Sequence, residues 1–318
     1  MKKVLVTGST GQIGSELTPA LRKRYGDDNV IAAGHATKPG ETLRNAGPYV
    51  ALDIREKAVL EKVVLFYGIE TIYHLAALLS VGAETQPELA WDVNINGLFN
   101  VLEVSRQHGC AVFHPSSIGA FGPGTPRDNT PQETIQRPST MYGITKVAGE
   151  LLCDYYHDKY GVDSRGVRYP GIISSEMLPG GGTTDYAVEI FYAALDRKKY
   201  SCFLAPGTYL DMMYMPDAVR AAIVLMEADP AILSYRNAYN VTAMSLAPEE
   251  LCAAIKKHIP DFTMTYVVDP MRQAIADSWP NCLDDSAARS DWGWSPDYDL
   301  ERMVTDMLAR LSEKRRLK

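Results

Sequence analysis

The stretch Val4-Leu5-Val6-Thr7-Gly8-Ser9-Thr10-Gly11-Gln12-Ile13-Gly14 joins a short apolar run to a glycine-rich turn and the start of an amphipathic segment. In such a turn Gly8 permits a tight bend, Gly11 lets the backbone approach a pyrophosphate, and Gly14 allows close packing of helix on strand. Free amides and the positive end of the following helix attract phosphate oxygens. The stretch therefore predicts a strand, a dinucleotide-binding turn and a helix, although a glycine triplet alone also occurs in ordinary strand-helix turns.

Apolar runs alternate with amphipathic stretches along the rest of the chain. We expect strands at residues 4–7, 30–33, 49–53, 71–75, 111–114 and 163–168, and helices at residues 12–25, 56–67, 89–108, 142–160, 185–196, 216–228 and 248–259. Strand-helix alternation folds as a doubly wound parallel sheet. The predicted fold class is α/β, with a Rossmann domain over residues 1–170. Residues 171–318 are expected to form mainly a smaller α/β substrate lobe, with some segments returning to the sheet.

Composition excludes several classes of function. The 318 residues include 32 Lys and Arg against 39 Asp and Glu, a net charge of −7, so no broad basic surface is expected for nucleic acid. No segment approaches the roughly 20 apolar residues of a membrane span. The five cysteines occur singly and no His cluster has metal-ligand spacing, so we expect neither disulfides nor a metal. The prediction is a soluble cytoplasmic protein with a small-molecule substrate.

The end of the second expected strand bears on the choice of nucleotide. An NAD site usually places an acidic residue there, whereas this sequence has Gly34. His35 and Lys38 would suit a 2′-phosphate, but the arginine that normally binds this group is missing, so NAD is the better expectation. Asp53, followed by Ile54, is a candidate for the adenine edge, and a capping role before the next helix is equally compatible with it.

Tyr142 and Lys146 lie four residues apart at the start of an expected helix, and therefore on one face of it. A nearby ammonium and a positively charged nicotinamide would lower the tyrosine pKa from about 10 and make the phenolate a usable general base. Ser116 and Ser117 end a strand at its carboxyl edge, where open α/β sheets bind ligands. Either serine could instead cap a turn, and the Tyr/Lys pair could be an ordinary surface pair.

Together with the strand end His74-Leu75-Ala76-Ala77, these motifs resemble the extended short-chain dehydrogenase/reductase superfamily. The resemblance implies that Ser117 orients the reacting oxygen, Tyr142 transfers the proton, and Lys146 holds the nicotinamide ribose. With the glycine-rich turn, it gives a set of expected cofactor-binding residues: Gly8, Thr10, Gly11, Gln12, Ile13, Gly14, His35, Asp53, Ile54, Leu75, Ala76, Ala77, Asn94, Tyr142, Lys146, Tyr169, Pro170 and Ile172.

Most extended members act on nucleotide sugars and carry an arginine for the substrate diphosphate where this chain has Leu210. An uncharged residue there argues against a diphosphate substrate. Residues 115–123, 179–187, 212–215 and 272–280 instead resemble the short-chain L-threonine 3-dehydrogenases. That resemblance implies oxidation of threonine to 2-amino-3-ketobutyrate. The alternatives are a nucleotide-sugar epimerase or dehydratase and a non-catalytic NAD(P)-sensing regulator.

The expected substrate-binding residues are Ser80, Ser117, Tyr142, Gly182, Thr183, Thr184, Asp185 and Trp279. Thr183 and Thr184 could offer hydroxyls and helix-end amides to a carboxylate. Asp185 could bind the ammonium or only interact with the helix dipole, and Trp279 could close the pocket or belong to the core. The glycines at 180–182 suit a lid. Superfamily resemblance also implies a homodimer through the helices at residues 89–108 and 142–160.

Overall fold

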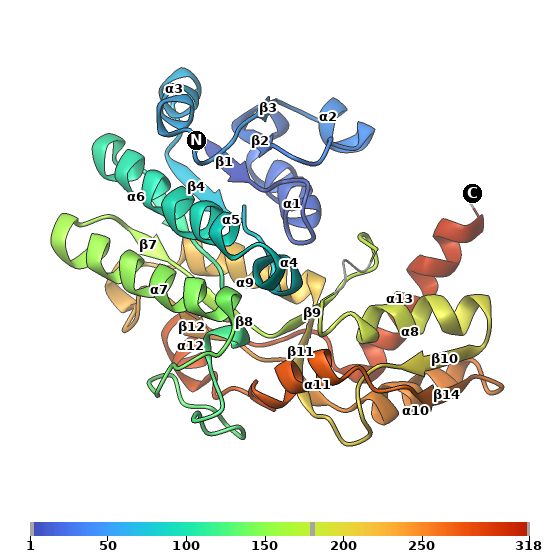
Figure 1. The fold of residues 1–318 in the computed structure, drawn as a ribbon. Helices are drawn as coiled ribbons and strands as arrows, with labels where there is room; N and C mark the ends of the chain where they lie inside the picture. The colour runs from blue at the N-terminus through green and yellow to red at the C-terminus, as the bar shows by residue number, and fades with distance from the viewer. Residues whose placement is uncertain (1–2, 179–181, 317–318) are drawn as a thin grey trace.

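A computed structural model describes residues 3–178 and 182–316 of the chain (Figure 1). Gly180 and Gly181 of the expected lid lie outside these ranges. The first half contains β1 (Val4–Thr7), α1 (Gly14–Tyr25), β2 (Val30–Gly34), α2 (Glu41–Asn45), β3 (Tyr49–Ala51), α3 (Lys57–Tyr67), β4 (Thr71–His74), α4 (Ser80–Thr85), α5 (Pro87–Trp91), α6 (Gly97–His108), β5 (Ala111–Phe113), β6 (Ser116–Ser117), α7 (Met141–Tyr160), β7 (Ser164–Arg165) and β8 (Val167–Tyr169).

The second half contains more, and shorter, elements. They are β9 (Gly171–Ile173), α8 (Tyr186–Asp196), β10 (Lys199–Cys202), β11 (Leu210–Tyr214), α9 (Met215–Glu227), β12 (Tyr239–Asn240), β13 (Met244–Leu246), α10 (Pro248–His258), β14 (Thr263–Tyr266), α11 (Pro270–Asp277), α12 (Ser286–Trp292) and α13 (Leu300–Arg316). Every helix and strand predicted from the sequence has a counterpart in the structure, although two of them are each divided into two elements and several ends shift by a few residues.

The central sheet is parallel and has the strand order β3-β2-β1-β4-β5-β7. The chain moves outward from β1 through β2 to β3 and then returns to the other side of β1 with β4. This reversal confirms the predicted doubly wound Rossmann fold. It also opens a crevice at the carboxyl ends of β1 and β4, where sheets of this kind bind ligands.

Side chains of β1 alternate between two cores. Leu5 packs on one face with residues of α3, α6 and α7, whereas Val4 and Val6 pack on the other with residues of α1, α9 and α12. Because helices cover both faces, the strands read as continuous apolar runs. A third core joins α8, α10 and α13 to β10 and β11, in the yellow-to-red part of Figure 1. The C-terminal half thus has its own core and also returns α9 and α12 to the sheet.

The strand expected at residues 163–168 is broken in two at Gly166. A Cβ atom on Gly166 would lie 2.2 Å from the His114 carbonyl oxygen and 2.1 Å from Asn237 Oδ1, so the backbone passes too close to its neighbours for any other residue. Beyond the break, β8 pairs with β6 and β12 in parallel. The break shifts the strand ends that carry Ser117 and Tyr169 relative to the main sheet.

The prediction of a single helix at residues 89–108 is also wrong in detail. It is two α-helices, α5 and α6, joined by a π-helical turn at Asp92–Asn96. The wider turn changes which side chains point inward, and π turns often occur at functional sites. Here the turn contains Asn94, a predicted cofactor residue.

The turn after β1 makes a testable demand on its first glycine. Gly8 has φ +69°, and a Cβ atom there would lie 2.7 Å from the Ala76 nitrogen; Gly68 has φ +63° with open space around it. Gly68→Ala should lower the free energy of unfolding by about 1 kcal/mol through backbone strain alone. Gly8→Ala should cost about 1–3 kcal/mol more because it also displaces the β4 end. Urea denaturation checks this, and equal losses would contradict it.

Candidate functional site

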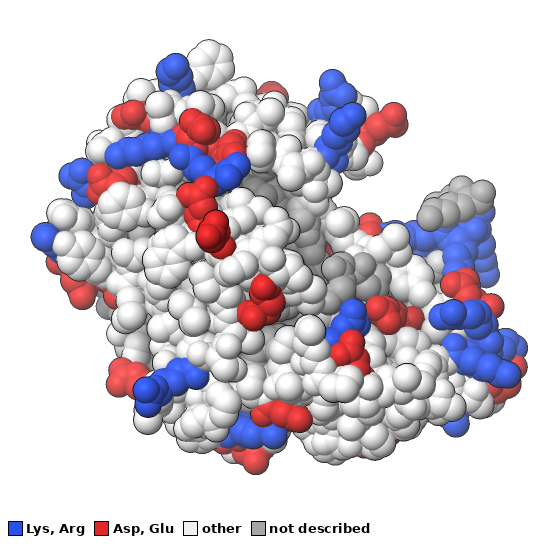
Figure 2. Space-filling view, in the orientation of Figure 1, with Lys and Arg blue, Asp and Glu red and all other residues white. Residues whose placement is uncertain are grey.

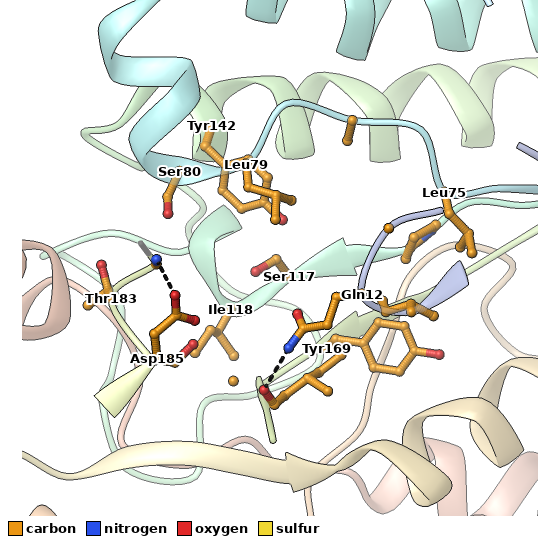
Figure 3. Close-up of a pocket in the computed structure, with 18 of the residues that line it drawn as sticks. Gln12, Leu75, Leu79, Ser80, Ser117, Ile118, Tyr142, Tyr169, Thr183 and Asp185 are labelled. Atoms are coloured by element: carbon orange, nitrogen blue, oxygen red, sulfur yellow. Dashed lines mark hydrogen bonds between the residues drawn. The ribbon is translucent and has the colours of Figure 1, made fainter. Parts of the chain in front are cut away.

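A cavity of about 370 Å³ lies at the carboxyl ends of β1, β4 and β6. Its lining is drawn in Figure 3, and Figure 2 shows that the same face is hollowed between the sheet and the C-terminal elements. The residues that line it are Gly8, Gly11, Gln12, Ile13, Gly14, Leu75, Ala77, Leu79, Ser80, Val81, Gly82, Pro115, Ser116, Ser117, Ile118, Tyr142, Lys146, Tyr169, Pro170, Gly171, Ile172, Met177, Leu178, Gly182, Thr183, Thr184, Asp185 and Trp279.

The glycine-rich turn forms one end of this cavity and has the shape that a pyrophosphate needs. A Cβ atom on Gly14 would lie 2.2 Å from the Gly8 carbonyl oxygen, so α1 approaches the turn as closely as backbone allows. Ile13 precedes α1 and supplies no side-chain cap to its first turn. Backbone amides at a helix start without a side-chain cap suit an anionic ligand. These residues fit the phosphates of a dinucleotide.

Several predicted cofactor residues surround the turn. Gln12 reaches across the cavity and donates from Nε2 to the Ile172 carbonyl oxygen at 3.3 Å, as the dashed line in Figure 3 shows. The tyrosine of the Tyr169-Pro170 corner donates from its hydroxyl to the Ala218 carbonyl oxygen at 2.6 Å. The first contact ties the β8–β9 corner to the turn after β1, and the second ties it to α9.

Six predicted cofactor residues do not line the cavity: Thr10, His35, Asp53, Ile54, Ala76 and Asn94. Ala76 contributes backbone beneath Gly8, and Thr10 lies beside Gly34. Ile54 is buried against Gly97.

Asn94 braces the loop after β4 instead of pointing at the cavity. Its side chain accepts from the Leu78 amide at 2.7 Å and donates to the Leu78 carbonyl oxygen and to Thr145 Oγ1, each at 3.0 Å. The π turn that carries Asn94 therefore connects α7 to the loop that leads to Ser80. Its contacts within the protein are structural.

Asp53 is not the cap of α3, because Glu56 occupies the position before that helix and the cap carries no side-chain hydrogen bond. Its carboxylate accepts two hydrogen bonds from the Arg55 guanidinium, at 2.6 and 3.0 Å, and lies 3.6 Å from His35 Nδ1. Arg55 also contacts Asp92 at 3.3 Å. The Arg55 contacts hold the pKa of Asp53 below its usual range.

Ser117, Tyr142 and Lys146 all line the other end of the cavity, as the sequence predicts; Figure 3 labels the first two. Ser117 Oγ accepts from the Gly119 amide at 3.1 Å, so the capping alternative is correct for this serine even though it also lines the cavity. The Tyr142 ring packs against Gly119, where a Cβ atom would lie 3.2 Å from it. Lys146 Nζ lies 5.4 Å from the centre of that ring and donates to the Pro115 carbonyl oxygen at 2.7 Å.

The pKa values of this group are dominated by burial. Burial raises the pKa of Tyr142 to about 12, opposed by its hydrogen bond with Ser117. Burial lowers the pKa of Lys146 to about 8, opposed by the nearby Glu150 carboxylate. The expected lowering of the tyrosine pKa is therefore not a property of the protein alone. Additional positive charge must enter the cavity before the phenolate becomes accessible near neutral pH.

The predicted substrate residues gather beside Ser117 and Tyr142. Ser80 begins α4 and is buried, and Asp185 accepts from the Gly182 amide at 2.7 Å (Figure 3). Thr183 is 1% exposed, and its hydroxyl finds no hydrogen-bond partner among residues 3–178 and 182–316. Thr184 packs against Gly171. This end of the cavity is therefore lined by hydroxyl and carboxylate groups.

Trp279 both lines the cavity and belongs to the core, the two alternatives considered from the sequence. It is 6% exposed and packs in the core with α8 and α10, and one side of it lines the cavity.

Sequence reasoning missed an apolar group at the cavity mouth. Leu79, Val81, Met177 and Leu178 line the cavity there, and Leu178 is 71% exposed; Ile118 also lines the cavity but is buried. The sequence could have indicated Leu79 and Val81, because both follow the predicted strand end at residues 71–75, on a loop that must border the crevice.

Two broader features can be stated for the described residues. Residues 3–178 and 182–316 contain no helix long and apolar enough to cross a bilayer, and no group of three or more His, Cys, Asp or Glu side chains able to hold a metal ion. On the face in Figure 2, Lys and Arg lie among Asp and Glu and do not form a continuous basic area.

Both a family profile and a curated relative described as epimerase/dehydratase match this chain. The sequence profile described as the NAD dependent epimerase/dehydratase family matches residues 4–242. An uncharacterized epimerase/dehydratase of Staphylococcus saprophyticus is 53% identical, over 99% of this chain and 98% of that protein.

Solved structures are also similar. L-threonine dehydrogenase from Clostridium difficile is 55% identical and superposes with a TM-score of 0.97, over 99% of this chain and 98% of that one. A monomeric L-threonine 3-dehydrogenase from a metagenome is 45% identical, with a TM-score of 0.94 over 98% and 99% of the two chains.

Burial of Lys146 predicts a specific pH dependence of stability. Its pKa is about 8 in the folded protein against 10.5 normally, so the unfolded chain binds this proton more tightly. The wild type should therefore gain about 2–3 kcal/mol of stability relative to Lys146→Met as pH rises from 8 to 10.5. Urea denaturation at both pH values measures this. The matched control is Lys62→Met at an exposed position of α3, where the difference in free energy of unfolding between wild type and variant should be the same at both pH values. The same result for Lys146→Met would contradict the prediction.

Proposed function

Because the chain belongs to the NAD dependent epimerase/dehydratase family, we propose that it is an NAD-dependent dehydrogenase that oxidises the side-chain hydroxyl of L-threonine to 2-amino-3-ketobutyrate. The observation that carries this proposal is a single cavity that joins a phosphate-binding turn, the Ser117/Tyr142/Lys146 group and a small polar end. Similarity to threonine dehydrogenases at 55% identity over nearly the whole chain supports the same substrate. In this proposal residues 1–170 bind NAD and residues 171–318 mainly bind substrate.

NAD is preferred to NADP on the charges near the end of β2. Gly34 leaves no acidic side chain at that point, which by itself fits either nucleotide. The nearby guanidinium of Arg55, however, is bound by the carboxylates of Asp53 and Asp92. A 2′-phosphate would have to compete with two carboxylates for this arginine, and NAD avoids that competition.

Alcohol oxidation removes a hydride from carbon and a proton from oxygen, and NAD, when bound, would supply the hydride acceptor. The phenolate form of Tyr142 would take the hydroxyl proton of threonine as the Cβ–O single bond becomes a carbonyl. Ser117 Oγ hydrogen-bonds the same substrate oxygen and fixes its direction. Lys146 places an ammonium 5.4 Å from the centre of the tyrosine ring and would hold the ribose hydroxyls, while the enclosing side chains exclude water.

The remaining charged groups of threonine find complementary residues at the polar end. The buried Thr183 hydroxyl and Ser80 suit the carboxylate as hydrogen-bond donors. Asp185, on the same side of the cavity, suits the ammonium (Figure 3). Trp279 and the apolar mouth cover a ligand of this size.

The alternatives fit the cavity less well. Leu210, where nucleotide-sugar enzymes carry an arginine, is fully buried in the C-terminal core and offers no charge to a diphosphate. A regulator that only senses NAD(P) has no use for Ser117, Tyr142 and Lys146 gathered at one point.

Replacement of the proposed base tests the chemistry. Wild-type protein should form NADH from NAD and L-threonine, and much less NADPH from NADP. Tyr142→Phe should lower kcat at least about 100-fold because the proton acceptor is lost, while NADH binding stays within about threefold. Absorbance at the reduced-nicotinamide band and NADH fluorescence measure the two quantities.

Tyr209→Phe is the matched control, since Tyr209 is an exposed tyrosine outside the cavity lining, and it should retain full activity. Retained turnover in Tyr142→Phe would remove the proposed base. Turnover of a UDP-sugar with none of threonine would replace the substrate assignment.

We also propose a homodimer through α6 and α7, which lie side by side in Figure 1. These helices carry the exposed apolar side chains Phe99, Ile144, Leu151 and Tyr155, and Trp91 ends the neighbouring α5. The α7 members recur at helical spacing and form one stripe, which a second copy of the chain could cover.

Leu151→Asp should convert the dimer to a monomer, because it places a charge in the centre of this stripe. Analytical ultracentrifugation over a range of concentrations measures the mass. Met271→Asp, an equally exposed apolar position on α11, should leave the dimer intact. A wild-type protein with monomer mass at all concentrations, like the metagenomic relative described as monomeric, would contradict the homodimer.

A further inference from the structure

A buried ion pair lies directly behind the wall that carries Ser117 and Lys146. Glu150 and Arg168 are 3% and 7% exposed. Glu150 Oε2 accepts from Arg168 Nη2 at 2.8 Å, and Oε1 accepts from Arg168 Nε at 3.0 Å. Such a paired arrangement orients both side chains strongly. Neither residue belongs to the sites predicted from the sequence.

The pair connects the elements that hold the reacting groups. Glu150 lies one turn beyond Lys146 on α7 and accepts a hydrogen bond from the hydroxyl of Ser116, the neighbour of Ser117 on β6. Arg168 lies on β8, where it pairs with Ser116 in the ladder and precedes Tyr169 of the cavity wall. One carboxylate therefore holds α7, β6 and β8 together at the cavity.

The remaining hydrogen-bonding groups of the pair are satisfied. Gln136 Nε2 donates to Glu150 Oε2 at 2.8 Å. Arg168 Nη1 donates to the Gln132 carbonyl oxygen at 2.8 Å and to Asn240 Oδ1 at 3.1 Å. A buried ion pair is stable only when such contacts complete it. Because removing both charges from water costs free energy, we expect the pair to do something that two apolar side chains could not.

That function is to provide a counter-charge for Lys146, because the ammonium of Lys146 is buried. Glu150 faces it from α7 and raises its pKa, as does Cys153 one turn further on, while burial acts in the opposite direction. Tyr142 faces Lys146 from the preceding turn. Glu150 is thus the charged carboxylate that acts on this ammonium.

The strands opposite Lys146 contribute two buried histidines. His74 on β4 and His114, directly after β5, stack with their ring centres 5.6 Å apart. Burial, and then the charge of Lys146, lowers the pKa of His74 to about 3 and that of His114 well below its usual range. Both rings are therefore neutral and do not replace Glu150 as a counter-charge.

We propose that Glu150 is a positioning residue for the proposed dehydrogenase reaction: held by Arg168, it fixes the Ser116–Ser117 strand end against α7 and places a carboxylate one helical turn from the buried Lys146 ammonium. This inference rests on the proposed function for its reaction but concerns a property of the protein that can be measured without threonine. Through Glu150, the ammonium remains available to a ribose hydroxyl over a wider pH range than burial alone would permit.

NADH binding across pH 6 to 10 tests the proposal, because it needs a protonated Lys146 and no substrate. In Glu150→Gln the pH at which NADH binding weakens should fall by about one unit relative to wild type. Glu150→Asp, which keeps the charge, should restore the wild-type midpoint at least in part. Lys146→Met should remove this step from the profile altogether.

Asp217→Asn is the matched structural control. Asp217 is a fully buried carboxylate on α9 that accepts from Arg220 and from the Asp297 and Tyr298 amides, away from the cavity. The Asp217→Asn protein should be less stable than wild type, but the pH midpoint of its NADH binding should not change. If Glu150→Gln fails to fold, the Glu150→Met/Arg168→Met double variant, which removes both buried charges, takes its place.

A folded protein that lacks the Glu150 carboxylate, either Glu150→Gln or the double variant, and still binds NADH with the wild-type pH midpoint would overturn the positioning role. Failure of the proposed function gives a different result: wild-type protein would bind NADH with the expected pH dependence yet show no threonine-dependent NADH formation.

Discussion

Burial of Tyr142 and Lys146 against the end of β6 is the constraint on which the site depends. Desolvation favours the neutral form of both groups, raising one pKa to about 12 and lowering the other to about 8. Proton transfer at neutral pH needs the opposite charges. The enclosing fold must therefore supply compensation, and Glu150 does so for Lys146. Tyr142 depends on positive charge that arrives with the nicotinamide.

The reversal of strand order between β1 and β4 brings the phosphate turn to this group. Gly8 lies against the Leu75-Ala76 backbone so closely that a side chain would displace it. The core on both faces of β1 fixes this approach, since Val4 and Val6 pack on one side and Leu5 on the other. Packing in the sheet and binding at its edge are consequently set by the same four-residue strand.

Local sequence patterns were sufficient for the elements of the Rossmann sheet and for the Ser117/Tyr142/Lys146 group, because apolar period, glycine spacing and helical spacing are local properties. They failed where a contact joins distant segments. Gly166 breaks a strand because His114 and Asn237 pass beside it, and Asn94 sits in a π turn that braces Leu78. Glu150 and Arg168 carry no local sign of their pairing, as each would also suit an exposed surface.

The polar end of the cavity shows the same dependence of chemistry on burial. A buried hydroxyl without a hydrogen bond costs about 1–3 kcal/mol, and Thr183 has no partner among residues 3–178 and 182–316. A ligand carboxylate that accepts from this hydroxyl would recover that energy. Because an apolar ligand could not, the same side chain disfavours ligands that lack an acceptor there. Selectivity for an amino acid would then arise from the hydroxyl that the protein itself leaves unsatisfied as much as from the contacts that form.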